Sequence, residues 1–547
     1  RIYSQYEKSY NDRDKTESRR RTNELIDHFL DGESAPGIEW EFSRLPVILE
    51  SFSLAEINDL VPVMYPDHSI VVQISMPDGK GITIPTEDQI DDLFKKVDQY
   101  AVSAYVDDAS DKPLLENLPQ PGKIMNQTLL NDLGVHEWEL SNGVKVVAKP
   151  TGFKNDEVLF HSYAHGGNSL TSDADYRSGR LASSIVEESG AGGFNTIQLE
   201  KLLTGKLVTV SPYIDKYFHG MNGSSTPKDL ETAFQLLYVM WTDPNYDQET
   251  FSNLMERYKV MVANRENNPE SKWNDLVNDV NYGSHYSVQP WTPEALDDVN
   301  LDAAMKIYKE RFSNPANFTF LFVGNFDLSE LKKLTEVYLG GLPVLNHEKT
   351  HPVEYNYKFP YLPKHAKIYM GSEEKSRTRI TFSRPLDADF DTYYYLDAAT
   401  DLLEVRLRKI LREDMGATYH VGSGTMNMQP SSDFAQTHIA FNCAPENVKK
   451  MTKAVMKEIK NLKKKAPTAE EVHNINEKYL NQREINLESN RYWVNALEGC
   501  YQHSIDPQDI LERDDRIRSF TPEIARKMIK KYYPKFKYTT VTLYPAK

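Results

Sequence analysis

An amphipathic helix followed by an apolar strand recurs three times along the chain. The three copies are Leu54–Pro77, Leu301–Asn325 and Thr521–Pro545. In each copy, apolar residues recur at helical spacing, a short turn with proline or aromatic residues follows, and a β-rich run closes the unit. A residue suited to an N-cap stands at the start of each helix, namely Ser53, Asn300 and Thr521. The pattern predicts a repeated α+β unit in which each strand lies in a sheet covered by its own helix.

A further helical segment precedes each copy. The short sequences Glu17–Arg19, Glu270–Lys272 and Glu488–Asn490 each begin with Glu-Ser and each lead into a helical stretch: NELIDHFL, NDLVNDV and YWVNALEGC. A single match of this kind would be expected in any protein built of helices and strands. Three matches in register favour a true internal repeat.

The spacing of the copies predicts the domain organisation. The second and third copies end 220 residues apart (545 minus 325), which is the length of one domain, whereas the first ends at residue 77. The first domain is therefore expected to lack most of its N-terminal part, so that the chain is the tail of a longer protein. Polar, proline-containing stretches mark the connectors. The predicted divisions are 1–106 for the truncated domain, 107–124 for a linker, and 125–345 and 346–547 for two complete domains.

Within the complete domains, local patterns predict the individual elements. The segment Val135–Pro150 alternates around Asn142-Gly143, which is a strong β-hairpin signal. Long helical patterns follow in both domains, and an apolar strand is expected at Arg379–Ser383. The predicted fold class is therefore α+β, with tandem repeated domains that each contain a mostly antiparallel sheet covered by helices.

Composition narrows the possible partners. The 64 Lys and Arg residues against 80 Asp and Glu give a formal net charge of −16, which disfavours nucleic acid and anionic membranes. Only two cysteines are present, too few for a disulfide framework. No apolar run approaches the ~18 residues that a membrane-spanning helix needs, so we expect no membrane span. The chain begins with Arg instead of Met, so we expect a processed or shortened polypeptide.

The duplicated α+β domains joined by a long linker resemble the pitrilysin and insulin-degrading-enzyme (insulinase-like) family of zinc endopeptidases. The resemblance covers nearly the whole chain and implies a LuxS/metallohydrolase-like fold. Family members have four similar domains in two halves that close around a peptide. The resemblance implies that this chain holds the second, third and fourth domains, and that its partner is a missing N-terminal domain that carries zinc.

The zinc motif of the family, an inverted His-x-x-Glu-His helix, does not occur in this sequence. The corresponding helix of the third domain is RLASSIVEE, in which Ser183, Val186 and Glu187 stand where the first His, the Glu and the second His would stand. Ser and Val cannot replace the family's residues at a zinc site. We therefore expect zinc as a cofactor of the intact enzyme and none in this chain.

A second family feature is present in the fourth domain. The segment LREDMGATYHVGSG resembles the one from which an Arg and a Tyr reach the active site, here Arg412 and Tyr419. Arg412 can offer a planar fork of donors to a substrate carbonyl, and the Tyr419 hydroxyl can donate to an oxyanion. Gly416 would allow the turn between them. An Arg at a helix end beside a half-buried Tyr is the structural alternative.

A His-Glu-x-x-His match occurs at His347, Glu348 and His351. On a helix, two histidines four residues apart could bind zinc. Pro352 follows the motif directly, and the residue before a proline is disfavoured in helical geometry. Because the match also lies in the connector between two repeats, we interpret it as a solvated loop and not as a metal site.

Three functional hypotheses remain. The first is the C-terminal part of an insulinase-like zinc metalloendopeptidase, which closes the peptide chamber, contacts the peptide substrate and is inactive by itself. The second is a non-catalytic peptide-binding or assembly subunit on the same fold. The third is a protease that uses the connector motif. The resemblance favours a periplasmic or secreted protein. The sequence determines neither the peptide substrate nor the oligomeric state.

Overall fold

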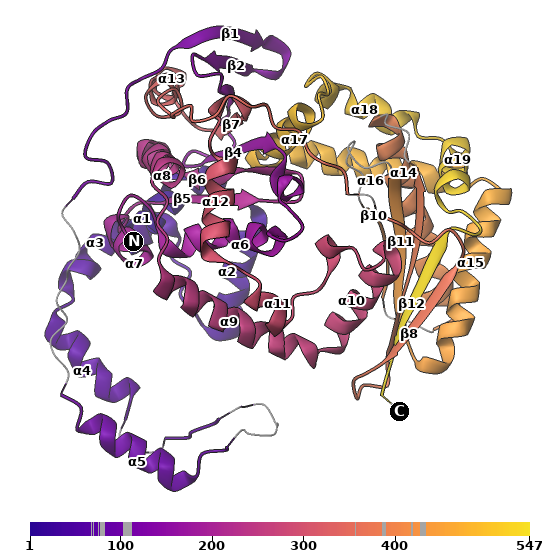
Figure 1. Cartoon of the computed structure of the whole chain (residues 1–547), viewed down its shortest axis with the longest axis horizontal. Helices are drawn as coiled ribbons and strands as arrows, with labels where there is room; N and C mark the ends of the chain where they lie inside the picture. The colour runs from indigo at the N-terminus through magenta and orange to yellow at the C-terminus, as the bar shows by residue number, and fades with distance from the viewer. Residues whose placement is uncertain are drawn as a thin grey trace. The chain divides into compact units, whose positions relative to one another are not determined.

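The computed structural model describes residues 1–66, 68, 70–74, 76, 83–101, 112–355, 357–385, 390–416, 420–426 and 434–546. The chain divides into two units, Arg1–Lys112 and Pro113–Lys547, here called the N-terminal and C-terminal units. Figure 1 colours the chain from indigo in the first unit to yellow at the end of the second. No helix of the described segments is long and apolar enough to cross a membrane.

All regular secondary structure in the described part of the N-terminal unit is helical. Aromatic contacts join its first and third helices, since the ring of Phe42 lies 5.5 Å from that of Tyr3 and 4.8 Å from that of Tyr10. The fourth helix begins with a capping box, in which Ser53 and Glu56 satisfy each other's backbone N–H groups. The helices are α1 (Ile2–Asn11), α2 (Ser18–Asp31), α3 (Ile38–Ser51), α4 (Leu54–Met64) and α5 (Glu87–Asp98).

The first copy of the repeat differs from the prediction. Helix α4 forms as expected, but the described residues 70–74 after it are not part of a strand. The prediction of a sheet-bound strand in this copy was wrong for those residues. A strand needs a neighbour for its backbone N–H and C=O groups, and the described part of the N-terminal unit contains no sheet that could supply one.

The C-terminal unit contains two sheets. The first has seven strands in the order β1-β2-β3-β7-β4-β6-β5, in which only β3 and β7 are parallel. Hairpin β2–β3 turns at Asn142-Gly143 as predicted, with Gly143 at φ 85°. The strands are β1 (Ile124–Leu130), β2 (Val135–Leu140), β3 (Lys145–Pro150), β4 (Val158–His165), β5 (Val208–Ile214), β6 (Phe218–Ser225) and β7 (Thr319–Gly324).

The second sheet repeats the first. Its order is β10-β11-β9-β12-β8, and only β12 and β8 are parallel. In reverse, this order is β8-β12-β9-β11-β10, which corresponds strand by strand to β3-β7-β4-β6-β5 of the first sheet. Corresponding strands occur in the same order along the chain, and corresponding pairs are parallel or antiparallel in the same way. The predicted α+β class with repeated sheets is therefore confirmed. The strands are β8 (Lys364–Tyr369), β9 (Ser376–Pro385), β10 (Val421–Met426), β11 (Phe434–Cys443) and β12 (Tyr538–Tyr544).

Each sheet buries both of its faces. Alternation along β7 places Phe320 and Phe322 on one face and Leu321 and Val323 on the other. Helices that are close to these strands in the sequence, such as α6, α8 and α12, cover the first of these faces.

The helices of this unit are α6 (Tyr176–Ser189), α7 (Thr196–Leu202), α8 (Leu230–Thr242), α9 (Gln248–Glu266), α10 (Pro269–Tyr282), α11 (Pro293–Asp297), α12 (Leu301–Arg311), α13 (Leu328–Leu334), α14 (Phe390–Arg408), α15 (Val448–Lys464), α16 (Ala469–Leu487), α17 (Asn490–Gln502), α18 (Asp509–Ser519) and α19 (Pro522–Tyr532).

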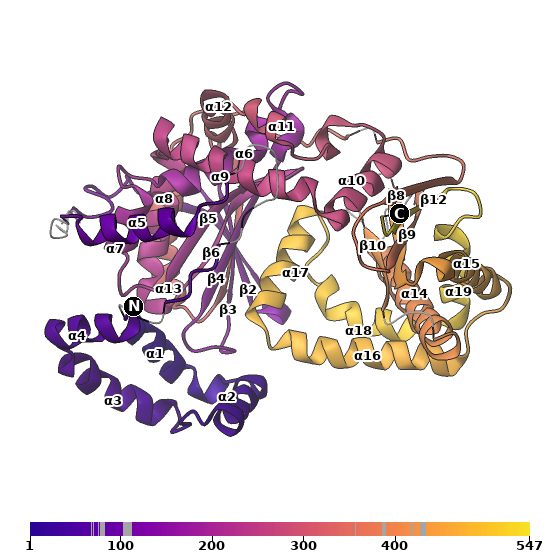
Figure 2. The ribbon, with the colours of Figure 1, turned by 90° about the horizontal axis from the view of Figure 1, so that it is seen from below.

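The C-terminal unit has two halves: the first contains the seven-stranded sheet, and the second contains the five-stranded sheet. Each half contributes one helix that packs on the sheet of the other half. Helix α17, from the second half, packs on β4 and β7 of the first sheet, and α10, from the first half, packs on β12 and β8 of the second (Figure 2). The helices correspond in the repeat, because the Glu-Ser sequence lies in the first turn of α10 (Glu270-Ser271) and directly before α17 (Glu488-Ser489). Exchange covers the second face of each sheet and joins the two halves into one unit.

Candidate functional site

Helix α6 carries the positions at which the sequence analysis expects the counterpart of the family's zinc motif. The helix packs on β5 and α12 and ends at Gly190, which has φ 87°. Ser183 is half-buried, and Glu187 is exposed, where its carboxylate accepts a 2.7 Å hydrogen bond from the Ser211 hydroxyl on β5. Because residues four apart share a face of a helix, Ser183 and Glu187 point to the same side.

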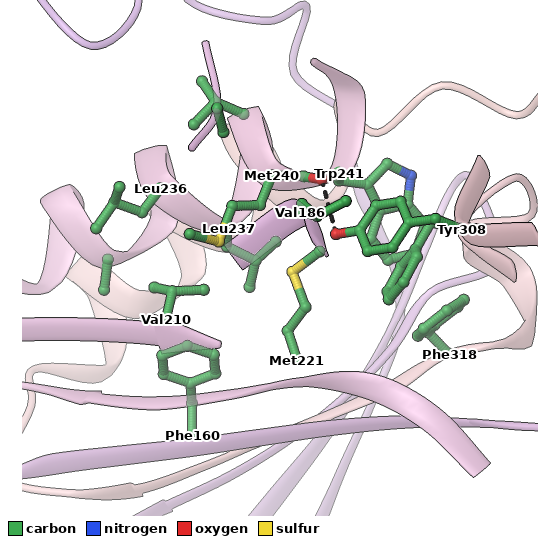
Figure 3. Close-up of a cluster of buried hydrophobic side chains, with 14 of the residues drawn as sticks. Phe160, Val186, Val210, Met221, Leu236, Leu237, Met240, Trp241, Tyr308 and Phe318 are labelled. Carbon is green, nitrogen blue, oxygen red and sulfur yellow. Dashed lines mark hydrogen bonds between the residues drawn. The ribbon is translucent and has the colours of Figure 1, made fainter. Parts of the chain in front are cut away.

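Val186 belongs to the hydrophobic core. Its side chain is fully buried in the cluster that contains Met221, Leu237 and Trp241, as Figure 3 shows. In the same cluster, the Tyr308 hydroxyl donates a 3.0 Å hydrogen bond to the Met240 carbonyl. The position where the motif has its Glu is therefore filled by an apolar side chain among apolar neighbours. This environment would strongly disfavour a charged group.

The residues of α6 do not fit a zinc ion. Zinc in proteins is held by Cys, His, Asp and Glu, and of the three motif positions only Glu187 offers such a group. Within the described ranges, no group of three or more His, Cys, Asp and Glu side chains could hold a metal ion. We therefore derive no metal chemistry from this helix.

The His-Glu-x-x-His match of the connector is not helical. Residues 343–355 have no regular secondary structure, and His347, Glu348 and His351 are exposed. The Glu348 carbonyl accepts hydrogen bonds from the side-chain amides of Asn314 (2.8 Å) and Asn317 (2.9 Å). In this extended segment, the two histidines do not have the spacing that one helical turn would give them.

Tertiary structure brings His351 near two histidines that the sequence analysis did not single out. His165, at the end of β4, and His503, just after α17, line the same pocket together with Tyr163. Burial and the nearby His351 lower the pKa of His165, and burial and His165 lower the pKa of His503. His503 comes close to His165 because α17 packs on β4 of the other half. The sequence alone does not indicate that these two positions are neighbours.

Arg412 lies where α14 ends. The helix continues as a π-helical turn over Lys409–Asp414, in which the Met415 N–H donates to the Ile410 carbonyl at 3.1 Å. Leu411 is fully buried, whereas Arg412 is exposed. The Arg412 side chain forms no hydrogen bond or ion pair within the described part of the chain. π-Helical turns occur frequently at functional sites.

The turn after Arg412 is anchored to the neighbouring strand. Gly416 adopts φ 59°, a left-handed conformation that favours glycine, and its N–H donates to the Arg412 carbonyl at 3.1 Å. The Glu404 carboxylate on α14 accepts from the Ser423 N–H on β10 at 2.7 Å and from Arg408 at 2.5 Å. The end of α14 is thus fixed to the start of the next strand. Tyr419, the predicted partner of Arg412, lies outside the described residues.

Comparison with known proteins identifies the family. A family model described as the peptidase M16 inactive domain matches residues 298–479. A "Zinc protease PQQL-like" protein of Arabidopsis thaliana is 26% identical over 100% of this chain and 57% of its own length. Residues 298–479 therefore match the peptidase M16 family, and the chain as a whole is similar to a zinc protease-like protein.

Solved structures agree with this assignment at the level of the fold. The periplasmic protease PqqL of Escherichia coli superimposes with a TM-score of 0.71 at 17% identity, over 100% of this chain and 60% of PqqL. The ferredoxin protease FusC, solved with Arabidopsis ferredoxin, superimposes with a TM-score of 0.75 at 17% identity, over 97% of this chain and 58% of FusC. The chain therefore spans less than two thirds of the length of these relatives.

The matched region has a clear position in the M16 fold. It begins just before α12, crosses the connector and the strands β8 to β11, and ends within α16. It therefore includes Arg412 and the π-helical turn, but excludes α6. The family predicted from the repeats and motifs is confirmed, while the roles of individual residues remain predictions.

Proposed function

We propose that this chain forms the half of an M16 peptidase that carries no zinc, and that it closes a peptide chamber against a zinc-bearing half. The observation that carries the proposal is the full burial of Val186 at the motif position of an M16 chain. A helix that bound zinc at this position would need polar side chains on the face that α6 buries in the hydrophobic core. The chain by itself is therefore expected to be inactive.

Arg412 is the substrate-contacting residue in this proposal. Its exposed guanidinium has no partner within the described segments, so its donors are available to a carbonyl group of a bound peptide. The hydrogen bonds of Glu404 to Arg408 and Ser423 hold the helix end from which Arg412 projects. A side chain on such a fixed end binds with a smaller loss of conformational entropy than one on a loose loop.

Tyr419 completes the proposed site. Its assignment depends on the sequence alone, since it lies seven residues after Arg412 in the segment that resembles the family's substrate-binding segment. A phenol hydroxyl can donate a hydrogen bond to the oxyanion that develops when a peptide carbonyl is attacked. We propose that Tyr419 stabilises this charge, while Arg412 positions the peptide.

The proposal is tested by kinetics on the full-length gene product with a fluorogenic peptide substrate. Tyr419→Phe removes one hydroxyl and should lower kcat by about 10²–10³-fold, the usual effect of losing one oxyanion donor. Arg412→Lys keeps the charge but loses the planar fork. It should lower kcat/KM by about 10–100-fold, which corresponds to one hydrogen bond to a charged group.

Arg518→Lys is the matched control, because Arg518 is an exposed Arg on α18 that pairs with the carboxylates of Asp514 and Asp515 on the same helix and has no part in the proposed site. It should leave kcat/KM within about twofold, the effect expected of an exposed ion pair. If Tyr419→Phe retained full turnover and only lowered the melting temperature, the Tyr would be structural and its proposed role would be rejected.

A second candidate is an assembly subunit on the same fold. Complex III of Candida albicans contains a chain that superimposes on 74% of this one with a TM-score of 0.57 at 13% identity. This similarity shows that the fold also occurs in a multisubunit complex. If the full-length gene product cleaved none of a mixed peptide library but copurified in a stable complex, the assembly function would replace the peptidase proposal.

A further inference from the structure

The two exchanged helices of the C-terminal unit make similar kinds of contact. On α17, Trp493 and Leu497 are buried on the first sheet, where the Lys149 ammonium lies 4.0 Å from the centre of the Trp493 ring. On α10, Trp273 is buried on the second sheet beneath Arg377, whose guanidinium lies 4.8 Å from the ring centre. Each helix thus places an apolar face, anchored by a Trp, on a sheet of the other half.

Helix α2 is the third copy of this element by sequence. It begins within Glu17-Ser18-Arg19, which corresponds to Glu488-Ser489-Asn490 at the start of α17. In this register, Ile26 and Phe29 of α2 stand where Leu497 and Cys500 stand on α17, both of which are buried. The sequence therefore gives α2 apolar residues at the positions that α17 uses to contact a sheet.

In contrast to its two counterparts, α2 is uncovered. Its apolar side chains Leu25, Ile26, Phe29 and Leu30 are 62%, 45%, 84% and 69% exposed, and the helix has no buried residue. These four residues lie on one side of the helix, because their spacing follows the helical period. Glu24 and Asp27 point to the other side, where they line a cavity with residues of α1 and α3. A continuous exposed apolar face of this kind indicates an interaction surface.

The sheets of the C-terminal unit are not available to α2. The face of the first sheet that would accept such a helix is covered by α17, and that of the second sheet is covered by α10. A third helix of this type therefore needs a third sheet. The M16 relatives are long enough to contain a further domain with a sheet, since this chain spans only 57% of the length of the Arabidopsis protein and 60% of that of PqqL.

We propose that the face of α2 formed by Leu25, Ile26, Phe29 and Leu30 docks on the β-sheet of a further α+β repeat that lies outside this sequence. The accepting face has the chemistry of the face that receives α17, with aliphatic residues such as Leu159 and Leu321. The identification of this repeat as the zinc-bearing domain depends on the proposed function, but the docking itself does not. In this arrangement, the exchange of helices joins consecutive repeats throughout the longer protein.

Hydrogen exchange measured by mass spectrometry tests the docking on this chain and on the full-length gene product that contains it. In this chain, the amides of α2 should exchange at the rate of an isolated helix. In the full-length product they should exchange at least about 100-fold more slowly, because opening then requires separation of a packed interface. Equal exchange in both proteins would overturn the proposal.

Variants identify the face that is covered. Phe29→Glu places a charge at the centre of the apolar face and should restore fast exchange of α2 in the full-length product. Asp27→Asn, on the opposite side, should leave it slow. Because Phe29 is exposed in this chain, the substitution should not change the circular dichroism of the chain alone. Unchanged protection in Phe29→Glu would contradict the proposed face.

Three further outcomes separate this proposal from its alternatives. If α2 were protected in this chain at high concentration, together with dimers in sedimentation that Phe29→Glu dissolves, a second copy would be the occupant and the proposal would fail. Protection in a full-length product that cleaves no peptide would support the docking and reject the peptidase function. Peptide cleavage without protection of α2 would reject the docking alone.

Discussion

His219 on β6 shows how burial fixes the state of a single side chain. It is fully buried, and the Gly167 N–H donates to its Nδ1 at 3.2 Å. Since Nδ1 is then the acceptor, Nε2 carries the proton and donates to the Arg311 carbonyl at 2.9 Å. Burial, with a further contribution from the charge of Arg311, lowers the pKa of His219 to about 3. The neutral ring is therefore part of the folded structure at neutral pH.

This pKa predicts a pH dependence of stability. The folded pKa of about 3 lies below the ordinary histidine pKa of 6.5, so between these values the unfolded chain binds a proton that the folded chain does not. His219 therefore favours folding fully above pH 6.5, and this contribution is lost as the pH falls toward 3, by up to ~1.4 kcal/mol per pH unit. In urea unfolding, His219→Gln should be less stable at pH 7 and should lose less stability than wild type between pH 6.5 and pH 4.

The exposed His473 on α16 provides the control for this experiment. Its side chain is 68% exposed, so His473→Gln should follow the wild-type pH profile. If His219→Gln declined as steeply as wild type, other groups would control the acid sensitivity.

Among the elements, the exchanged helices α10 and α17 connect the two sheets. Their tryptophans are buried on sheets from the other half, and the Trp273 indole N–H also donates to the Val541 carbonyl at 3.1 Å. Apolar burial provides most of the binding energy of such a helix, and the cations over each ring add a directional contribution of about 0.5–2 kcal/mol. Loss of either Trp should therefore weaken the connection between the halves.

Alanine substitution measures this contribution. Trp493→Ala and Trp273→Ala should each lower the free energy of unfolding by about 3–5 kcal/mol, since each removes a large buried side chain and leaves a cavity. Trp40→Ala, at a tryptophan that is 52% exposed, should have a much smaller effect. Equal effects of all three substitutions in urea unfolding would show that the exchange does not contribute to stability as argued.

The whole molecule is expected to carry no zinc of its own. Val186 is buried in the core, and His347 and His351 lie in a segment without regular secondary structure. Elemental analysis of the purified chain should find far less than one zinc per molecule, and the chain should not cleave peptides. About one zinc per chain, lost in His347→Ala but kept in His473→Ala, would contradict this prediction and support the connector motif.

The sequence determined the repeated pattern of helices and strands, because the spacing of apolar residues and the capping and turn residues are local signals. The hairpin at Asn142-Gly143 agrees with the prediction, and so does the strand expected at Arg379–Ser383, which lies within β9. The family was also predictable, because the duplicated α+β pattern and the long linker can be read from the sequence alone. Strand β8, at Lys364–Tyr369, was missed. It is short and largely exposed, and it lies at a sheet edge.

Only the tertiary structure decided which sheet each helix covers. The amphipathic pattern of α10 and α17 shows that each must bury one face, but either sheet could satisfy that requirement locally. The exchange depends on contacts between residues far apart in the chain, such as Lys149 with Trp493 and Trp273 with Val541. The same reason explains the first repeat copy, where residues 70–74 have the pattern of a strand but no neighbouring strand in the described part of their unit. A strand requires a partner, and local sequence cannot supply one.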